Sequence, residues 1–448
     1  MFDKVLVANR GEIAVRIVRA LQELGVKSLV AYSEADRDTL AVQLADESIC
    51  VGPAQAAQSY LSIPAMVGAA LTRGAQAIHP GYGFMAENAT FARTVADNGL
   101  VFIGPSPAAI EKMGDKNVAR ETMKRIGVPT VPGSDGPLTS ADEAMQIADQ
   151  VGYPVVIKAS AGGGGRGMRE VADQSGMADA FAAAKAEALA AFGNDEVYLE
   201  KFVVRPRHIE IQVLADNFGN AMHLGERDCS LQRRHQKLLE ESPSPAVSPE
   251  LRAAMGQAAL AAVREVGYTS AGTVEFLLGT DYSFYFMEMN TRIQVEHPVT
   301  ELVTATDLIK EQVRIAAGEP IGCLDRQGAS PQGHAIEFRI NAEDPSRGFM
   351  PSPGTITALR LPGGPGVRVD THIYQGYTVP PTYDSLIAKL IVWGSDRAEA
   401  VARGKRALAE FSIDGIQTTI PFHRWVLEQN DFNAGEVHTD FISLHGLD

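Results

Sequence analysis

Residues 153–167 read YPVVIKASAGGGGRG, a short apolar run that ends in four consecutive glycines. The run predicts a β-strand, and the glycines cannot extend it because glycine loses the most backbone freedom on ordering. A loop of this composition can bring backbone N–H groups close to phosphate oxygens and can close over a ligand as a lid. Lys158 before the glycines and Arg166 within them favour phosphate binding over a plain flexible turn.

The run also matches the dinucleotide-binding pattern G-x-G-x-x-G through Gly162, Gly164 and Gly167. That fingerprint belongs in the first strand–helix unit of a chain and opens a helix. Here it lies in mid-chain and is followed by the strand-like residues 168–171. An NAD-dependent oxidoreductase is therefore disfavoured. A Walker A loop is excluded too, because no Gly-Lys-Ser/Thr closes the run.

Toward the N-terminus, strand and helix signals alternate. Residues 13–24 repeat apolar side chains at helical spacing. Four apolar runs predict strands, at 4–8, 28–32, 75–79 and 100–103. Strands that alternate with helices imply parallel βαβ units. Residues 104–130 then predict a helical connector, with Asp115 as an N-cap.

Toward the C-terminus the pattern changes. Residues 131–203 predict a small α+β unit, with a helix at 177–192 and a strand at 197–203 after the glycine run. A larger and mostly antiparallel domain is expected over 204–448. Its predicted strands lie at 207–215, 272–278, 284–290 and 334–341. The fold class is therefore a multidomain α/β and α+β protein.

The composition excludes several classes of protein. The 448 residues include 40 Lys and Arg against 55 Asp and Glu, a net charge of −15, which would repel nucleic acid and anionic membranes. Apolar runs are too short for a membrane helix, and Asp3 and Lys4 interrupt any signal-peptide core. The three cysteines are scattered, which suits a reducing compartment. We expect a soluble cytoplasmic protein that binds neither nucleic acid nor membrane.

Two carboxylates predict a metal site. Pairing residues 273–278 with 284–290 as a hairpin brings Glu275 close to Glu288, with Asn290 on the same face. Facing carboxylates repel each other, and a hard cation such as Mg²⁺ bound between them would offset the repulsion and make the pair a metal site. The alternatives are a register that separates the two, or side chains that both point into water.

Further polar residues follow an alternating pattern. Arg292, Gln294 and Glu296 can converge in one pocket, and residues 233–237 form a basic cluster (RRHQK) suited to an anionic substrate. Arg339 lies on the polar face of the last predicted strand. The polar face of 207–215 is typical of a solvated strand and by itself predicts no function. The glycine loop, lysines, carboxylates and arginines together indicate phosphoryl transfer to a small anion.

Seven motifs resemble biotin carboxylase, in family order and over essentially the whole chain. They are ANRGE (8–12), HPGYGF (79–84), MGDK (113–116), KASAGGGGRGM (158–168), ERDCSLQRRHQK (226–237), EMNTRIQVEHP (288–298) and RINAED (339–344). The resemblance implies an ATP-grasp fold with four parts: a Rossmann-like domain (1–103), a helical connector (104–130), a glycine-rich lid (131–203) and a C-terminal ATP-grasp and biotin carboxylase domain (204–448). It also implies the reaction, in which ATP phosphorylates bicarbonate to carboxyphosphate and the carboxyl group passes to N1′ of biotin.

The resemblance assigns roles to residues of this chain. ATP would contact Lys116, Lys158, Gly164, Gly165, Glu200, Lys201, Phe202, Val203, His208, Gln232, His235, Glu275 and Glu288. Mg²⁺ or Mn²⁺ would be held by Glu275, Glu288 and Asn290. Bicarbonate would be bound by Lys237, Arg292, Gln294, Val295 and Glu296, with Glu296 as the base. Biotin would meet Tyr82, and Arg339 would stabilise its enolate. Catalysis would thus depend on Arg292, Glu296, Lys237 and Arg339.

The resemblance also implies partners. The sequence ends without the Ala/Val-Met-Lys-Met tetrapeptide of a carrier domain. We therefore expect a homodimeric subunit that works with a separate biotin carboxyl carrier protein and carboxyltransferase subunits, as in acetyl-CoA carboxylase of fatty acid synthesis. A subunit of another acyl-CoA or pyruvate carboxylase is the alternative. A non-catalytic nucleotide-binding regulator is disfavoured, because such a protein needs no base or bicarbonate clamp.

Overall fold

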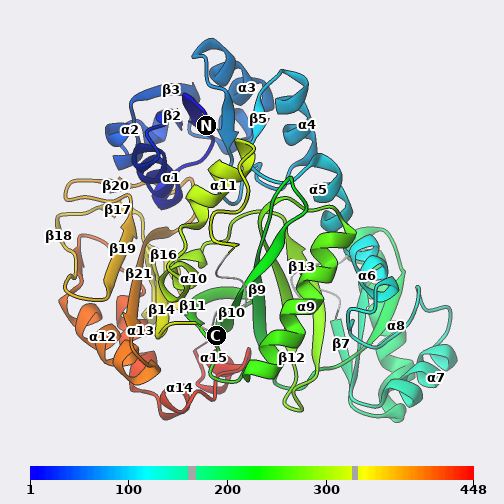
Figure 1. Ribbon diagram of the computed structural model, residues 1–448. Coiled ribbons are helices and arrows are strands. Elements are labelled where there is room, and N and C mark those ends of the chain that lie inside the picture. Colours follow the sequence, from blue (N-terminus) through cyan, green and yellow to red (C-terminus); the bar gives the residue numbers. More distant parts are fainter. Residues whose placement is uncertain (160–167, 325–330, 448) are drawn as a thin grey trace.

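The computed structural model describes residues 1–159, 168–324 and 331–447, which fold around three main β-sheets (Figure 1). The first sheet is parallel, and the other two are antiparallel. None of the helices described in these ranges is long and apolar enough to cross a membrane.

The N-terminal sheet has the strand order β3-β2-β1-β4-β5 and is parallel throughout, as the alternating pattern predicts. Its strands are β1 (Lys4–Val7), β2 (Lys27–Ser33), β3 (Glu47–Gly52), β4 (Ala77–His79) and β5 (Val101–Phe102). Its helices are α1 (Gly11–Glu23), α2 (Leu40–Leu44), α3 (Ile63–Thr72) and α4 (Ala89–Asp97). The sequence does not predict β3, an edge strand with few buried residues and hence a weak apolar signal.

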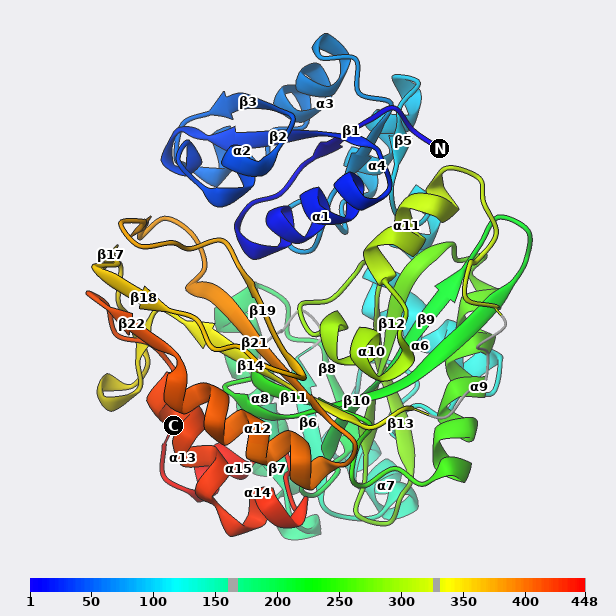
Figure 2. The ribbon, with the colours of Figure 1, turned by 60° about the vertical axis from the view of Figure 1, so that its left-hand side comes forward.

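Helix α1 joins this sheet to the rest of the molecule (Figure 2). Its buried Ile13 and Ile17 share a core with α11 (Leu308–Ala316). Arg16 of α1 donates to Glu301 Oε1 at 2.9 Å and Asp307 Oδ1 at 2.6 Å. The predicted connector is a helix pair, α5 (Pro107–Gly114) and α6 (Lys116–Arg125). Asp115 caps α6 as predicted, accepting from two backbone N–H groups.

The second sheet is small and has the order β7-β6-β8. It comprises β6 (Val155–Ala159), β7 (Met168–Val171) and β8 (Val197–Lys201), and it packs against α7 (Ala141–Val151) and α8 (Met177–Phe192). These helices stand at the opposite side of the molecule from the C-terminal helices (Figure 1). The glycine loop, with the predicted phosphate contacts Gly164 and Gly165, lies outside the described residues.

The third sheet has eight antiparallel strands in the order β13-β12-β9-β10-β11-β14-β21-β19. The predicted strands are β9 (Arg207–Ala215), β12 (Ser270–Leu278), β13 (Phe284–Asn290) and β14 (His334–Asn341). The sequence does not predict β10 (Ala221–Arg233), β11 (Gln236–Ser242), β19 (Val367–Thr371) and β21 (Leu386–Gly394). Charged residues interrupt the first two, yet they are largely buried at the centre of the sheet.

Helices and short strands complete the sheet. The helices are α9 (Pro249–Glu265), α10 (His297–Thr304), α12 (Arg397–Glu410), α13 (Ile420–Glu428), α14 (Asn430–Ala434) and α15 (Phe441–Leu444). The short strands are β15 (Glu343–Asp344), β16 (Met350–Pro351), β17 (Gly354–Thr355), β18 (Ala358–Arg360), β20 (Thr378–Val379) and β22 (Ser412–Asp414). Helix α12 is fixed to the sheet by Glu241 of β11, whose Oε2 lies 2.7 Å from both Arg397 Nε and His334 Nε2.

This buried cluster gives a testable pH dependence. Burial alone would raise the pKa of Glu241, but His334 and Arg397 lower it from its ordinary 4.5 to about 2. The stabilisation is therefore complete above about pH 5 and is lost as the pH falls toward 2. We predict that Glu241→Gln destabilises the fold by about 3 kcal/mol at pH 7, and that the difference from wild type narrows between about pH 5 and pH 3.

Thermal unfolding followed by circular dichroism across this pH range measures the effect. The control is Glu410→Gln, which removes an exposed i,i+4 pair with Arg406 and should leave the stability close to that of wild type. Equal effects of the two variants would contradict the prediction.

Candidate active site

The polar face of β9 is buried, contrary to the expectation that it is solvated. His208, Glu210 and Gln212 are each less than 9% exposed. The face is covered by residues 291–296 and by helix α10. Gln294 of that segment and Thr300 of α10 contact the Arg227 guanidinium, as Glu210 and Gln212 also do. Sequence alternation shows that these side chains share a face, but it does not show what covers that face.

Arg227 of β10 is the guanidinium at the base of this site. It is fully buried and donates to five acceptors, using all its N–H groups. The acceptors are Glu210 Oε1, Gln212 Oε1 (2.7 Å), Thr300 Oγ1 (2.9 Å), Thr273 Oγ1 (3.1 Å) and Gln294 Oε1 (2.9 Å). Arg227 therefore fixes side chains of β9, β12 and α10 relative to one another.

Lys237 of β11 lies among three carboxylates. Its Nζ is 2.6 Å from Glu210 Oε2, 3.2 Å from Glu275 Oε1 and 2.6 Å from Glu296 Oε1. Burial alone would lower the pKa of Lys237, but the three carboxylates outweigh burial and raise it well above the ordinary value. Lys237 is therefore a permanent positive charge in the site, and it is 13% exposed.

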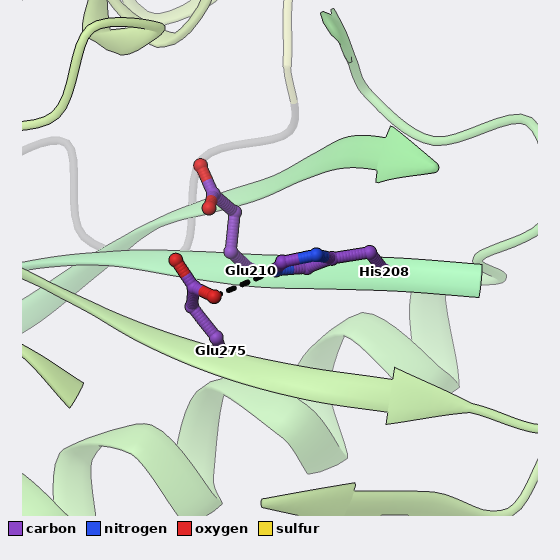
Figure 3. Close-up of side chains that lie close together, drawn as sticks. All are labelled: His208, Glu210 and Glu275. Atoms are coloured by element: carbon purple, nitrogen blue, oxygen red, sulfur yellow. Dashed lines mark ion pairs between the residues drawn. The ribbon is translucent and has the colours of Figure 1, made fainter. Parts of the chain in front are cut away.

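His208, Glu210 and Glu275 present one potential metal-ligand atom each, all within 4.8 Å of one another (Figure 3). His208 and Glu210 project from β9, and Glu275 projects from the adjacent β12. His208 Nε2 lies 2.7 Å from Glu275 Oε2. His208 and Glu210 were not among the predicted metal ligands. Two of the three residues, Glu210 and Glu275, offer the carboxylate oxygens that hard cations prefer.

The hairpin register that the sequence predicts is confirmed. Glu275 of β12 stands opposite Glu288 of β13, and Asn290 Nδ2 donates to Glu275 Oε1 at 2.7 Å. Glu288 is more exposed, and its Oε2 lies 3.2 Å from Lys116 Nζ at the start of α6. Arg292 donates to Asn290 Oδ1 at 2.9 Å. The three predicted metal ligands thus lie at one end of the hairpin.

Glu296 is held between two cations. Its Oε1 faces Lys237, and its Oε2 accepts from Arg339 at 2.9 Å. Burial alone would raise the pKa of Glu296, but Lys237, Arg339 and Arg227 hold it well below the ordinary value, so this buried group is a carboxylate. Gln294 of the same segment donates to Glu275 Oε1 at 2.7 Å. Of the base, amide and cation predicted from alternation, Glu296 and Gln294 thus both reach the group around Lys237. The predicted cation, Arg292, contacts Asn290 and Glu87 instead.

A second carboxylate holds Arg339. Glu240 Oε1 accepts from Arg339 Nε at 2.6 Å, and Glu337 stands opposite Glu240 in the β11–β14 register. Burial raises the pKa of Glu240 to about 7 and that of Glu337 well above its ordinary value. Protonation of these neighbours limits the negative charge around Arg339 at neutral pH.

The predicted nucleotide residues divide between two sheets. Lys158 of β6 pairs with Glu200 of β8, which also accepts from Arg120 at 2.9 Å. Lys201 Nζ donates to the carbonyls of residues 152 and 153, and Phe202 and Val203 follow β8. On the large sheet, Gln232 Nε2 lies 3.4 Å from His208 Nδ1. His235 is exposed at the tip of the β10–β11 hairpin, where it and Arg234 adopt positive φ.

A cavity of about 470 Å³ opens beside Arg339. Tyr82 and Glu12 of the N-terminal unit line it, together with Val295 and Arg339. Tyr82 donates its hydroxyl proton to Glu12 Oε1. The structure therefore brings the two predicted biotin residues, Tyr82 and Arg339, to one cavity next to the predicted base.

Several residues of the site are absent from the sequence predictions. They are Glu210, Arg227, Glu240, Glu12 and Lys389. For the four strand residues, the signal that could have found them is a charged residue within a strand pattern, because a buried charge needs a partner. Glu12 lies in the first turn of α1 and gives no such signal. The partners themselves come from distant segments and cannot be read from local spacing.

Three family models match the chain in succession. They are "Biotin carboxylase, N-terminal domain" at residues 1–110, "Carbamoyl-phosphate synthase L chain, ATP binding domain" at 115–324 and "Biotin carboxylase C-terminal domain" at 337–444. Together with the charged cluster on the antiparallel sheet, they define an ATP-grasp ligase. The expected fold class is confirmed.

Individual relatives agree with these models. A biotin carboxylase of Nostoc sp. is 59% identical over 98% of each chain. A pyruvate carboxylase subunit of Methanothermobacter thermautotrophicus is 53% identical over 100% of this chain and 91% of its own. The crystal structure of the biotin carboxylase domain dimer of Hydrogenobacter thermophilus 2-oxoglutarate carboxylase, with MgADP, ADP and bicarbonate, matches with a TM-score of 0.89. It is 50% identical and covers 100% of this chain and 98% of that one. The chain belongs to the biotin carboxylase family, and its activity is that of a biotin carboxylase.

The role of Arg227 can be tested by a conservative substitution. Lysine keeps the charge but offers three donors without the planar fork, so it cannot serve five acceptors on three elements. We predict that Arg227→Lys lowers turnover at least about tenfold and destabilises the fold by about 3 kcal/mol.

Steady-state ATP cleavage and thermal unfolding measure the two effects. The control is Arg264→Lys at an exposed position at the end of α9. An Arg227→Lys variant as active and stable as that control would show that the guanidinium fork is dispensable.

Proposed function

We propose that this chain uses Mg-ATP to convert bicarbonate to carboxyphosphate and carboxylates biotin on a separate carrier protein, as the first half-reaction of acetyl-CoA carboxylase in fatty acid synthesis. The observation that carries the proposal is Glu296, a buried carboxylate contacted by Lys237 on one oxygen and by Arg339 on the other. One base thus adjoins both the predicted bicarbonate residues and the cavity predicted to bind biotin.

The geometry gives Glu296 a basicity that depends on substrate. Its two cations keep it ionised and make it a weak base while they pair with it. A bicarbonate anion that binds Lys237 and Arg292 would compete for the same positive charge. Glu296 would then be a stronger base, next to the bicarbonate proton it must accept. Deprotonated bicarbonate is the better nucleophile toward the γ-phosphorus of ATP.

The remaining predicted residues fit the other substrates. Glu275, Glu288 and Asn290 would hold Mg²⁺, which neutralises phosphate charge and orients the transferring group. Their oxygen donors suit a hard cation, and the 2-oxoglutarate carboxylase domain binds MgADP and bicarbonate. Lys116 and Lys158 would contact the phosphates. In the cavity, Tyr82 would meet the biotin ring, and Arg339 would stabilise the negative charge on its ureido oxygen.

The proposal also covers the acyl acceptor and the assembly of the enzyme. The Methanothermobacter relative is the observation that favours the second candidate, a pyruvate carboxylase subunit. We propose a homodimer that works with a biotin carboxyl carrier protein and carboxyltransferase subunits in the cytoplasm. Support for the dimer comes from the 2-oxoglutarate carboxylase domain.

Substitution of the base tests the first step. We predict that Glu296→Gln lowers bicarbonate-dependent phosphate release about 10²-fold or more and leaves ATP binding intact, because the amide cannot accept the proton. Phosphate release with and without bicarbonate, together with equilibrium nucleotide binding, measures both. The matched control is the exposed Glu428→Gln on α13, which should behave as wild type. Turnover of Glu296→Gln near that of the control would remove Glu296 from this role.

The acceptor is tested by reconstitution. The chain is mixed with Mg-ATP, labelled bicarbonate, its carrier protein, the carboxyltransferase subunits, acetyl-CoA and pyruvate, and the label is followed into malonyl-CoA or oxaloacetate. Label in malonyl-CoA is the expected result. Label in oxaloacetate instead would establish the second candidate.

A further inference from the structure

Lys389 of β21 is a fully buried lysine that the mechanism above does not use. Its Nζ donates to the carbonyl oxygen of Val295 at 2.7 Å and lies 3.0 Å from Glu12 Oε1. In the sheet register Lys389 stands opposite Arg339 of β14 on one side and Asp370 of β19 on the other. Burial alone would lower the pKa of Lys389, but Glu12, Glu337 and Asp370 outweigh it and raise the pKa, so the group is an ammonium.

Glu12 connects this lysine to the other side of the cavity. It lies in the first turn of α1 as the last residue of the ANRGE motif and is 2% exposed. The same oxygen that faces Lys389 accepts the hydroxyl proton of Tyr82. Asn9, in the same motif, donates to the carbonyls of Pro80 at 2.7 Å and Tyr82 at 2.8 Å. Tyr82 is therefore fixed at both its backbone and its hydroxyl.

These contacts form one continuous path. It runs from the Tyr82 hydroxyl through Glu12 and Lys389 to the Val295 carbonyl, and the next residue along the chain is the base Glu296. Tyr82, Glu12 and Val295 all line the same cavity. Glu12 Oε1 makes both contacts, and Glu12 Oε2 is buried without a hydrogen-bond partner among the described residues. The pair ties the N-terminal unit to the 291–296 segment, and it does so at the cost of burying charge.

We propose that Glu12 and Lys389 are positioning residues that couple the biotin side of the cavity to the bicarbonate side. The pair holds Val295 and Glu296 at a fixed separation from Tyr82. Biotin, which accepts the carboxyl group, and the carboxyl donor are then bound at a fixed distance from each other. This inference rests on the proposed function, in which biotin meets Tyr82 and bicarbonate meets Val295 and Glu296. Small errors in such a separation reduce the rate of a two-substrate reaction steeply.

The proposal predicts that a substitution on the biotin side of the cavity changes the KM for bicarbonate, and that a substitution at Lys389 changes the KM for biotin. Tyr82→Phe removes a hydroxyl on the biotin side and should raise the KM for bicarbonate about threefold or more, with the KM for ATP unchanged within about twofold. Lys389→Met should raise the KM for free biotin about fivefold or more, although the lysine itself is buried behind the cavity. Steady-state carboxylation of free biotin, with each substrate varied in turn, gives these constants.

A tyrosine outside the cavity supplies the matched control. The Tyr374 hydroxyl donates to the carbonyl of Asp38 at 2.6 Å and so also joins the C-terminal part to the N-terminal unit. Tyr374→Phe should leave the KM values for biotin and bicarbonate unchanged. If Tyr82 had only a structural role, Tyr82→Phe would change the KM values for biotin, bicarbonate and ATP together, or change none of them, relative to Tyr374→Phe.

A double-mutant cycle completes the test. Tyr82→Phe and Lys389→Met should be clearly non-additive, because each breaks the same path. If Lys389→Met does not fold, Tyr82→Phe and its control decide the question alone. Additive effects, or a Tyr82→Phe variant altered only toward biotin, would overturn the coupling. A wild-type chain without bicarbonate-dependent ATP cleavage would overturn the proposed function, and the coupling with it.

Discussion

The site depends on one largely buried ammonium group, that of Lys237, shared by three carboxylates. Lys237 neutralises charges contributed by β9, β12 and the 291–296 segment, which would repel one another without it. The wider cluster joins four carboxyl groups, those of Glu210, Glu275, Glu296 and Glu240, to three cations, Lys237, Arg227 and Arg339. Removing one of the cations leaves the buried carboxylates with less compensating positive charge, so the fold and the chemistry constrain the same residues.

The three sheets explain how so many charges can be buried together. The eight-stranded sheet supplies a rigid face on which β9, β10, β11, β12 and β14 each contribute one or two charged side chains. The N-terminal unit closes one side of that face through Glu12 and Tyr82, and Glu87 accepts from Arg292 at 2.8 Å. The small β6–β7–β8 sheet presents Lys158 and Glu200 on the side predicted to receive the nucleotide. Elements far apart in sequence thus each hold one part of the site.

The sequence predicts the local features of this arrangement well. The parallel N-terminal strands, the Asp115 cap and the Glu275–Glu288 hairpin register all follow from spacing alone, because short-range geometry determines them. Helix α7 was not predicted, although Ser140 and Glu143 form an S-x-x-E start signal and the Ser140 hydroxyl accepts from the Glu143 N–H. The roles of Arg227, Glu240 and Lys389 were not readable, because each is defined by partners from distant strands. The domain bounds remain a prediction.

The most direct test of the account is phosphate release from Mg-ATP by the wild-type chain and by Lys237→Met, with and without bicarbonate. The account predicts that wild-type release requires bicarbonate and that the variant loses this bicarbonate-dependent rate about 10²-fold or more while still binding nucleotide. A folded Lys237→Met variant that keeps the wild-type rate and bicarbonate dependence would contradict it. The shared ammonium would then be a structural feature of the sheet and not the centre of the chemistry.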